Sequence, residues 1–127
     1  MSPAQLQRAR LLTLVTAGVW LAGCGQPPRP STVPAGDPLS LELRDYRFRP
    51  QALRARAGRA RVEVVNRGRL PHAFQLRLEG RERLRIPTVL PGERGAATTT
   101  LKRGSYRFAC PIANHEELGM HGVLTVR

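Results

Sequence analysis

Residues 106–122 read Tyr106-Arg-Phe-Ala-Cys110-Pro-Ile-Ala-Asn-His115-Glu-Glu-Leu-Gly-Met120-His-Gly122 and contain the pattern Cys-x4-His-x4-Met. One thiolate, one imidazole and one thioether on a single loop suit copper that cycles between Cu(I) and Cu(II). The sulfur ligands favour Cu(I), and the imidazole accepts either oxidation state. A trigonal site of this kind needs a second histidine, which the rest of the chain must supply.

The composition indicates one small all-β domain with a strongly basic surface. The 127 residues suffice for a single domain, and 11 prolines and 12 glycines between short apolar runs favour strands over helices. Lysine and arginine number 21 against 9 acidic residues, and Lys102 is the only lysine. This excess could attract anionic lipid or an acidic protein, or it could simply cover solvent-facing strand positions. Scattered arginines, few aromatic residues and no recognisable motif argue against nucleic acid.

The N-terminus has the features of an export signal that ends in a lipidation site. Arg8 and Arg10 precede an apolar run, residues 11–22, which is shorter than the roughly 20 residues that a membrane-spanning helix needs. The run ends in Leu21-Ala-Gly-Cys24, which resembles a bacterial lipobox. We therefore expect a lipoprotein signal peptide over residues 1–23 and a lipidated Cys24 that holds the protein to a membrane outside the cytoplasm. The alternatives are an ordinary signal peptide with a chance cysteine and an uncleaved anchor.

Lipidation of Cys24 would also decide the state of the second cysteine. Cys110 would then be a lone thiol in an oxidising compartment, where it is at risk of oxidation unless it is buried or bound to metal. After Cys24, residues 24–38 are rich in proline and have almost nothing to bury, which predicts an extended tether. The tether could let the domain reorient toward a partner, or it could be a plain spacer.

Residues 39–127 show the short alternating runs of one β-sandwich domain. Strands are predicted at residues 39–44, 45–50, 53–57, 60–66, 72–78, 96–101, 105–110 and 122–127. Tyr46 and Phe48 are expected to point inward. Residues 80–85 are expected to form a charged hairpin or loop, residues 86–92 to be irregular, and residues 112–118 to include one helical turn. Seven to eight strands make an all-β Greek-key sandwich the predicted fold.

The second histidine ligand has to be chosen from His72 and His121. His72 begins a predicted strand and shares its inward face with Phe74. A histidine in this position is usually a hydrogen-bonded core residue. His72, however, is predicted to point inward as Cys110 does, and it would fill the open ligand position. His121 is expected to face solvent, with a weak accessory metal contact or a pH-sensitive surface group as the alternatives.

Four segments resemble the plastocyanin/azurin family of blue copper proteins, the cupredoxins: Asn66-Arg-Gly-Arg-Leu-Pro-His72, Gly104-Ser-Tyr-Arg-Phe-Ala-Cys110, Pro111 to His115, and Gly119-Met-His-Gly122. The ligand spacing is similar to that of rusticyanin and auracyanin. The resemblance implies a cupredoxin-like domain over residues 39–127 with one type 1 copper. It also implies that His72, Cys110 and His115 are equatorial ligands and that Met120 is the long axial ligand.

The chain departs from this family at the residue after the first histidine. Many relatives have Asn or Ser there, with a hydrogen bond near the thiolate, whereas this chain has Ala73. Support for the thiolate is then either missing or comes from elsewhere, for example from Asn66. Pro71, Pro111, Ile112 and Leu118 are expected to form an apolar collar around an exposed edge of His115. Glu116 and Glu117 are expected to tune docking there.

The sequence thus predicts a membrane-tethered type 1 copper protein that carries single electrons between redox partners in the cell envelope, on its periplasmic side. Copper delivery or buffering is the alternative function, although the chain has only two methionines and no Met/His-rich tract. A copper enzyme would need further histidines, and only His121 is left over. We expect a monomer without catalytic residues, and a redox partner of cytochrome or oxidase type whose docking surface is acidic.

Overall fold

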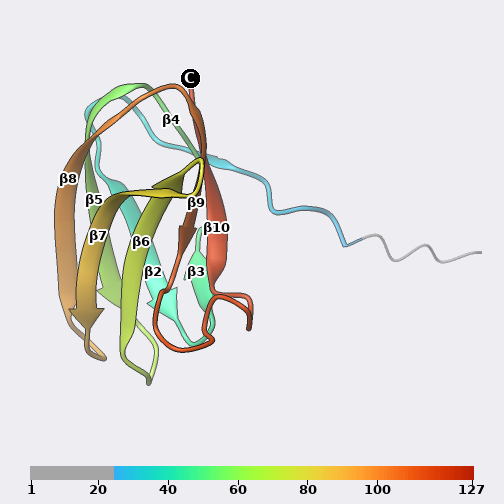
Figure 1. The fold of residues 1–127 in the computed structure, drawn as a ribbon, viewed down its shortest axis with the longest axis vertical. Coiled ribbons are helices and arrows are strands. Elements are labelled where there is room, and N and C mark those ends of the chain that lie inside the picture. Colours follow the sequence, from blue (N-terminus) through green and yellow to red (C-terminus); the bar gives the residue numbers. More distant parts are fainter. Residues whose placement is uncertain (1–24) are drawn as a thin grey trace, which may run out of the picture.

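The computed structural model describes residues 25–127, so the predicted signal peptide and Cys24 lie outside the described residues. Ten strands form two sheets that pack face to face (Figure 1). The strands are β1 (Ser31–Thr32), β2 (Leu39–Arg44), β3 (Arg47–Arg49), β4 (Ala52–Ala55), β5 (Gly58–Asn66), β6 (His72–Leu78), β7 (Arg81–Val89), β8 (Arg94–Leu101), β9 (Gly104–Ala109) and β10 (His121–Val126). Residues 25–127 contain no helix that is long and apolar enough to cross a membrane.

The two sheets confirm the predicted all-β sandwich. One sheet has the strand order β1-β4-β10-β9-β6-β7, and the other has the order β3-β2-β5-β8. Eight of the ten strands correspond to the predicted ones, and β1 and β7 are additional. The loops after β5 and β9 and the turn after β2 all lie at one end of the sandwich, and the C-terminus lies at the other (Figure 1).

Residues 80–85 were predicted as a charged hairpin or loop, and they belong to a hairpin in which β7 pairs with β6; β7 also extends to Val89, which corrects the prediction that residues 86–89 are irregular. Leu84, Ile86 and Val89 are buried, while the charged residues of the strand, Arg81, Glu82, Arg83 and Arg85, face solvent. The alternation was missed in the sequence because many residues of this segment are charged, as in a loop. β7 is an edge strand of its sheet, and edge strands often carry charged side chains. Pro87 is also tolerated there, since an edge strand has one row of unpaired N–H groups.

The turn between β2 and β3 corrects the predicted orientation of Tyr46. Leu43 at the end of β2 and Phe48 in β3 are both buried, but the chain reverses between them. Tyr46 lies in this turn with a φ of 60° and is 39% exposed. A bulky residue rarely adopts a positive φ, because its Cβ crowds the backbone. The inward alternation therefore stops at the turn, and Tyr46 lies at the surface.

The core beneath the loops is built on three buried phenylalanines. Phe48 packs edge-on against Phe74 and Phe108, with ring centroids 5.8 Å and 5.2 Å apart, and Phe74 stacks on Phe108 at 5.8 Å. Phe74 follows His72 by two positions, and Phe108 precedes Cys110 by two. Side chains two positions apart point to the same face of a strand. The aromatic core therefore fixes the inward direction of both candidate ligands.

Part of the predicted tether lies on the sandwich. Ser31 and Thr32 pair in parallel with β4, and the Val33 N–H donates a hydrogen bond of 2.8 Å to the Arg54 carbonyl. The Val33 side chain packs against the core. Before β1, the described chain runs away from the sandwich (Figure 1).

Candidate metal centre

The register of the β9–β10 hairpin brings Cys110 and Met120 together. Ala109 lies opposite His121 in the antiparallel pair. The residues that follow on the loop side, Cys110 and Met120, therefore also face each other. The Cys110 N–H donates to the Met120 carbonyl at 3.0 Å, and the Met120 N–H donates to the His115 carbonyl at 2.9 Å. Both sulfur side chains are fully buried. One loop thus delivers three of the four predicted ligands to one buried place.

The loop consists of tight turns, and the bond from Leu118 to Asn114 closes a single turn of the α-helical type within the range in which one helical turn was expected. The His115 N–H donates to the Ile112 carbonyl at 3.0 Å, and the Leu118 N–H donates to the Asn114 carbonyl at 3.1 Å. These bonds hold His115 with its side chain turned inward. Its ring is only 8% exposed.

His72 enters the site from the neighbouring strand, because β6 pairs with β9. The Ala73 N–H lies 3.5 Å from Sγ of Cys110, so a main-chain donor reaches the sulfur from the position at which Asn or Ser was expected. This main-chain N–H takes the place of the side-chain donor that many relatives have beside the sulfur.

Asn66 has a different task from the one that the sequence indicated. Its Nδ2 donates to the carbonyls of Leu70 and Val89, each at 2.8 Å, and its Oδ1 accepts from the Gly68 N–H at 2.8 Å. None of these bonds goes to the sulfur. Asn66 is buried and fastens the loop that leads into His72.

The donor atoms of His72, Cys110 and His115 all lie within 4.8 Å of one another, and all three residues are buried. Sγ of Cys110 is 3.6 Å from Nδ1 of His115, and the two imidazole centroids are 5.2 Å apart. Nδ1 of His72 is buried without a hydrogen-bond partner among residues 25–127. A buried polar atom without a partner is costly, so this nitrogen is suited to a ligand that the protein chain does not supply.

The electrostatics at His72 keep its ring neutral. Burial lowers the pKa of His72, a hydrogen bond to Asp45 raises it, and the nearby His115 lowers it, with a net result below the ordinary value. For Asp45, burial acts to raise the pKa, but the N–H groups of Arg69 and Leu70 and the His72 ring lower it below the ordinary value. A neutral imidazole is the form that binds metal.

The prediction that one edge of the His115 ring is exposed is wrong. The ring of Tyr46 packs edge-on against the His115 ring, with centroids 5.1 Å apart and planes at 84°. Tyr46 therefore covers the histidine and is itself the exposed aromatic residue. Of the predicted collar, Leu118 and Pro71 are exposed, while Pro111 and Ile112 are half-buried.

Two contacts to the histidines, those of Asp45 and Tyr46, were not predicted from the sequence. Both residues lie in the β2–β3 turn, far from the ligand loop in sequence. A signal was present, because buried leucines fall on odd positions up to Leu43 whereas the next buried residue is Phe48. Such a change of parity marks a turn, and turns at the ligand end of the sandwich are candidates for contacts with the site.

Glu116 is tied to the sheet and is not a free docking charge. Its Oε1 accepts a hydrogen bond from Nε of Arg107 at 2.7 Å and pairs with Arg77 as well. Burial acts to raise the pKa of Glu116, but these two guanidinium groups hold it below the ordinary value. The ligand loop is thereby fastened to β6 and β9. Glu117 is exposed.

His121 is half-buried at the start of β10 and lies opposite Ala109 in the strand pair. It is not part of the metal-binding cluster. Its alternation with buried Gly122 and Leu124 places it on the outer face of the sheet, as expected for a surface histidine.

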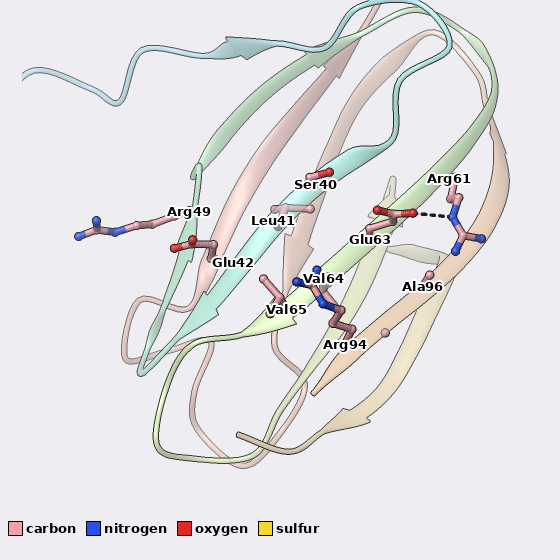
Figure 2. Close-up of a pocket in the computed structure, with 11 residues that line it drawn as sticks. Ser40, Leu41, Glu42, Arg49, Arg61, Glu63, Val64, Val65, Arg94 and Ala96 are labelled. Atoms are coloured by element: carbon pink, nitrogen blue, oxygen red, sulfur yellow. Dashed lines mark hydrogen bonds and ion pairs between the residues drawn. The ribbon is translucent and has the colours of Figure 1, made fainter. Parts of the chain in front are cut away.

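An open hollow of about 460 Å³ lies elsewhere, on the outer face of the four-stranded sheet (Figure 2). Glu42, Glu63, Arg49, Arg61 and Arg94 are among the side chains that line it. Glu63 forms an ion pair with Arg61 across its wall, as Figure 2 shows, at 2.7 Å. The hollow contains none of the candidate metal ligands.

The sequence matches the family model of the cupredoxin-like domain over residues 12–126. The chain belongs to this cupredoxin-like family. With Met120 next to Cys110, the cluster of His72, Cys110 and His115 is consistent with the type 1 copper site of a cupredoxin. The chemistry of the donor set fits copper, and so does the His72 nitrogen that has no partner in the described part of the chain. No curated protein matches the chain.

Solved cupredoxins share the fold at low sequence identity. Auracyanin from Roseiflexus castenholzii is 17% identical with a TM-score of 0.64, over 69% of this chain and 94% of that one. Auracyanin A from Chloroflexus aurantiacus, a "blue" copper protein, is 18% identical with a TM-score of 0.61, over 72% and 100%. A copper-containing nitrite reductase from Thermus scotoductus is 24% identical with a TM-score of 0.53, over 78% of this chain but 25% of that enzyme. The likeness to the reductase is thus to one part of a larger protein.

Proposed function

We propose that this cupredoxin carries single electrons between redox partners outside the cytoplasm, by means of one type 1 copper. The observation that carries the proposal is the buried set of two imidazoles, one thiolate and one thioether, with three donor atoms within 4.8 Å of one another. Copper bound there would supply one-electron chemistry between Cu(I) and Cu(II). The residues of the chain would hold the ligand geometry, exclude water and present a surface to the partner.

The packing around the ligands supports a rigid site. His72 and Cys110 extend from strands whose next inward residues, Phe74 and Phe108, are almost fully buried. The loop that holds His115 is closed by the backbone bonds of Cys110 and Met120. A densely packed interior resists rearrangement. Little change of ligand positions between oxidation states would favour fast electron transfer.

The surface near the site supports brief docking. Exposed large apolar side chains at this end of the sandwich are Tyr46, Leu90 and Leu118. Arg67 and Arg69 lie in the adjacent β5–β6 loop, and the Arg69 side chain is 95% exposed. Redox partners that meet briefly bury little surface, and charge complementarity speeds their encounter. We infer a partner of cytochrome or oxidase type with an acidic rim.

Attachment to a membrane is part of the same proposal and rests on the sequence around Cys24. A lipidated Cys24 followed by a proline-rich tether would keep the domain at the membrane surface of the cell envelope. Replacing Cys24 with Ala is expected to release the protein from the membrane fraction. Continued partitioning of that variant into detergent-rich phase would contradict the lipid anchor.

The burial of the donors argues against the alternative role in copper delivery. A delivery protein needs ligands that another protein can reach, whereas His72, Cys110 and Met120 are fully buried and His115 is nearly so. An enzymatic role would need a second copper site. The whole sequence has three histidines, and the third, His121, lies outside the cluster.

A visible spectrum with a redox titration tests the proposal. The full-length protein, purified in mild detergent and loaded with Cu(II), is expected to show the intense thiolate-to-copper band of a type 1 site and one reversible one-electron transition. Cys110→Ser is expected to abolish the band. Tight copper binding without colour, or a band that survives in Cys110→Ser, would refute the type 1 assignment.

A further inference from the structure

Asp45 makes three polar contacts through one oxygen near the metal centre, although it lies outside the ligand loop. Its Oδ1 accepts hydrogen bonds from the N–H groups of Arg69 at 2.9 Å and Leu70 at 3.2 Å. The same oxygen lies 3.2 Å from Nε2 of His72. One carboxylate oxygen thus joins the β2–β3 turn to the loop before β6 and to a candidate copper ligand.

This contact assigns a role to each nitrogen of the His72 ring. A carboxylate can only accept hydrogen bonds, so Nε2 must carry the proton and donate a hydrogen bond to Asp45. In a neutral imidazole the other nitrogen then keeps its lone pair. That nitrogen, Nδ1, is the buried atom without a partner among residues 25–127, and His72 belongs to the metal-binding cluster.

The surrounding chain holds Asp45 in place by more than a surface ion pair. The Arg67 N–H donates to the Leu43 carbonyl at 2.8 Å, which joins the β5–β6 loop to the end of β2. A Cβ on Gly68 would lie 2.4 Å from Oδ1 of Asp45 and 3.1 Å from Nε2 of His72, so only glycine leaves room for this contact. The Arg69 side chain lies 3.6 Å from Oδ2 and is almost fully exposed, so it adds little.

We propose that Asp45 is a positioning residue for the copper ligand His72. Its carboxylate fixes the tautomer and the ring orientation of His72, so that Nδ1 is presented to the metal. The negative charge also strengthens the imidazole as a donor, which favours Cu(II) over Cu(I) and lowers the reduction potential. This inference rests on the proposed copper site and adds a determinant of its potential that the ligand set alone does not contain.

Three variants of the full-length protein in detergent test the role of Asp45. Asp45→Asn removes the charge but keeps an oxygen that can accept from the loop. Asp45→Ala removes both. Glu42→Gln is the matched control, because it removes a charge three residues earlier, where Glu42 pairs with Arg44 at 2.9 Å and touches no histidine.

Copper affinity and potential give the first measurement. Asp45→Asn is expected to weaken Cu(II) binding about 10-fold to 100-fold in a chelator competition. The reduction potential should rise, because the affinity for Cu(II) falls more than the affinity for Cu(I). A tenfold difference between these two losses of affinity corresponds to about 59 mV for one electron. Glu42→Gln should match the unsubstituted protein. If Asp45→Asn behaves as Glu42→Gln does, or if it changes only the thermal stability of the metal-free protein, Asp45 merely supports the loop and the proposal fails.

The metal-free protein gives a second measurement that does not depend on copper. Nitrogen-15 NMR of its histidine side chains is expected to place the His72 proton on Nε2. Asp45→Ala should lose this preference. A proton on Nδ1 in the unsubstituted protein would overturn the inference. A missing blue band would instead contradict the proposed function while leaving the NMR result intact, so the two failures can be told apart.

Discussion

The Tyr46 ring meets the His115 ring edge-on, with centroids 5.1 Å apart, so an aromatic residue from the β2–β3 turn shields a histidine of the ligand loop. His115 is 8% exposed and Tyr46 is 39% exposed. The backbone at Tyr46 has a φ of 60°, a conformation that costs a bulky residue about 1–3 kcal/mol. Strain of this size persists only where the surroundings hold the residue in place. We therefore expect the ring to control access to the metal centre.

Tyr46→Ala is expected to destabilise the protein by about 1 kcal/mol, because an edge-to-face aromatic pair contributes roughly 0.5–1.5 kcal/mol beyond its buried area. The variant should also lose copper to a chelator several-fold faster, since water reaches His115. Denaturant titration and the decay of the blue band measure the two effects. Tyr46→Phe keeps the ring and should match the unsubstituted protein. Equal rates of copper loss in all three proteins would show that the ring does not shield the site.

The ligand loop was readable in the sequence, whereas its supports were not. Cys110, His115 and Met120 lie within eleven residues, and strand parity pointed from Phe74 to His72. These relations are local, so alternation and spacing suffice to find them. Asp45 and Tyr46 reach the histidines only because the sandwich brings the β2–β3 turn to the ligand end. Contacts of this kind depend on how the strands assemble, which alternation within a single strand does not encode.

The difference between local patterns and contacts that depend on the assembled sandwich also explains which strands were predicted. The predicted strands with a strong alternation, such as Leu39–Arg44 and His72–Leu78, are present in the structure. Strand Arg81–Val89 was missed because its solvent-facing positions are charged and one holds proline, which are features of loops as well as of edge strands. Its place at the sheet edge is a property of the assembled sheet.

Glu116→Gln is expected to loosen the ligand loop. The glutamate side chain is 28% exposed and pairs with Arg77 and Arg107, so we expect a loss of no more than about 1 kcal/mol in the free energy of unfolding. The difference from the unsubstituted protein should shrink at high salt, because partly exposed ion pairs are screened. Thermal unfolding at low and high salt measures both effects. Glu117→Gln, next to it and exposed, is the control and should change little. An equal loss in both variants would mean that the two ion pairs do not hold the loop.

Met120→Leu is expected to keep the blue colour and to raise the reduction potential. The side chain is fully buried, and a swap of Met for Leu of similar volume costs less than about 1.5 kcal/mol, so the fold should survive. Loss of the thioether removes a weak donor that stabilises Cu(II). Redox titration measures the shift. Leu124→Met makes the reverse exchange at a buried position of β10, outside the ligand loop, and should leave the potential alone. An unchanged potential in Met120→Leu would show that Met120 is not the axial ligand.

Gly68→Ala is expected to damage both stability and copper binding, because of the place at which the new methyl group would lie. Its Cβ would be 2.4 Å from Oδ1 of Asp45, 3.0 Å from the Asp45 nitrogen and 3.1 Å from Nε2 of His72. Relieving such overlap costs about 1–3 kcal/mol in a packed region. Because the displaced atoms are those that orient His72, the blue band should also shift or weaken.

Gly95→Ala separates the loss of stability from the effect on copper binding. Its Cβ would lie 2.6 Å from Cγ2 of Ile86 and 3.1 Å from Cγ2 of Val89, which is comparable crowding, but at β8 and against apolar side chains only. We expect a similar loss of stability by denaturant titration with an unaltered copper spectrum. If both variants unfold more easily and neither changes the spectrum, crowding at Gly68 is relieved without moving His72. The loop before β6 would then contribute to folding but not to the geometry of the metal centre.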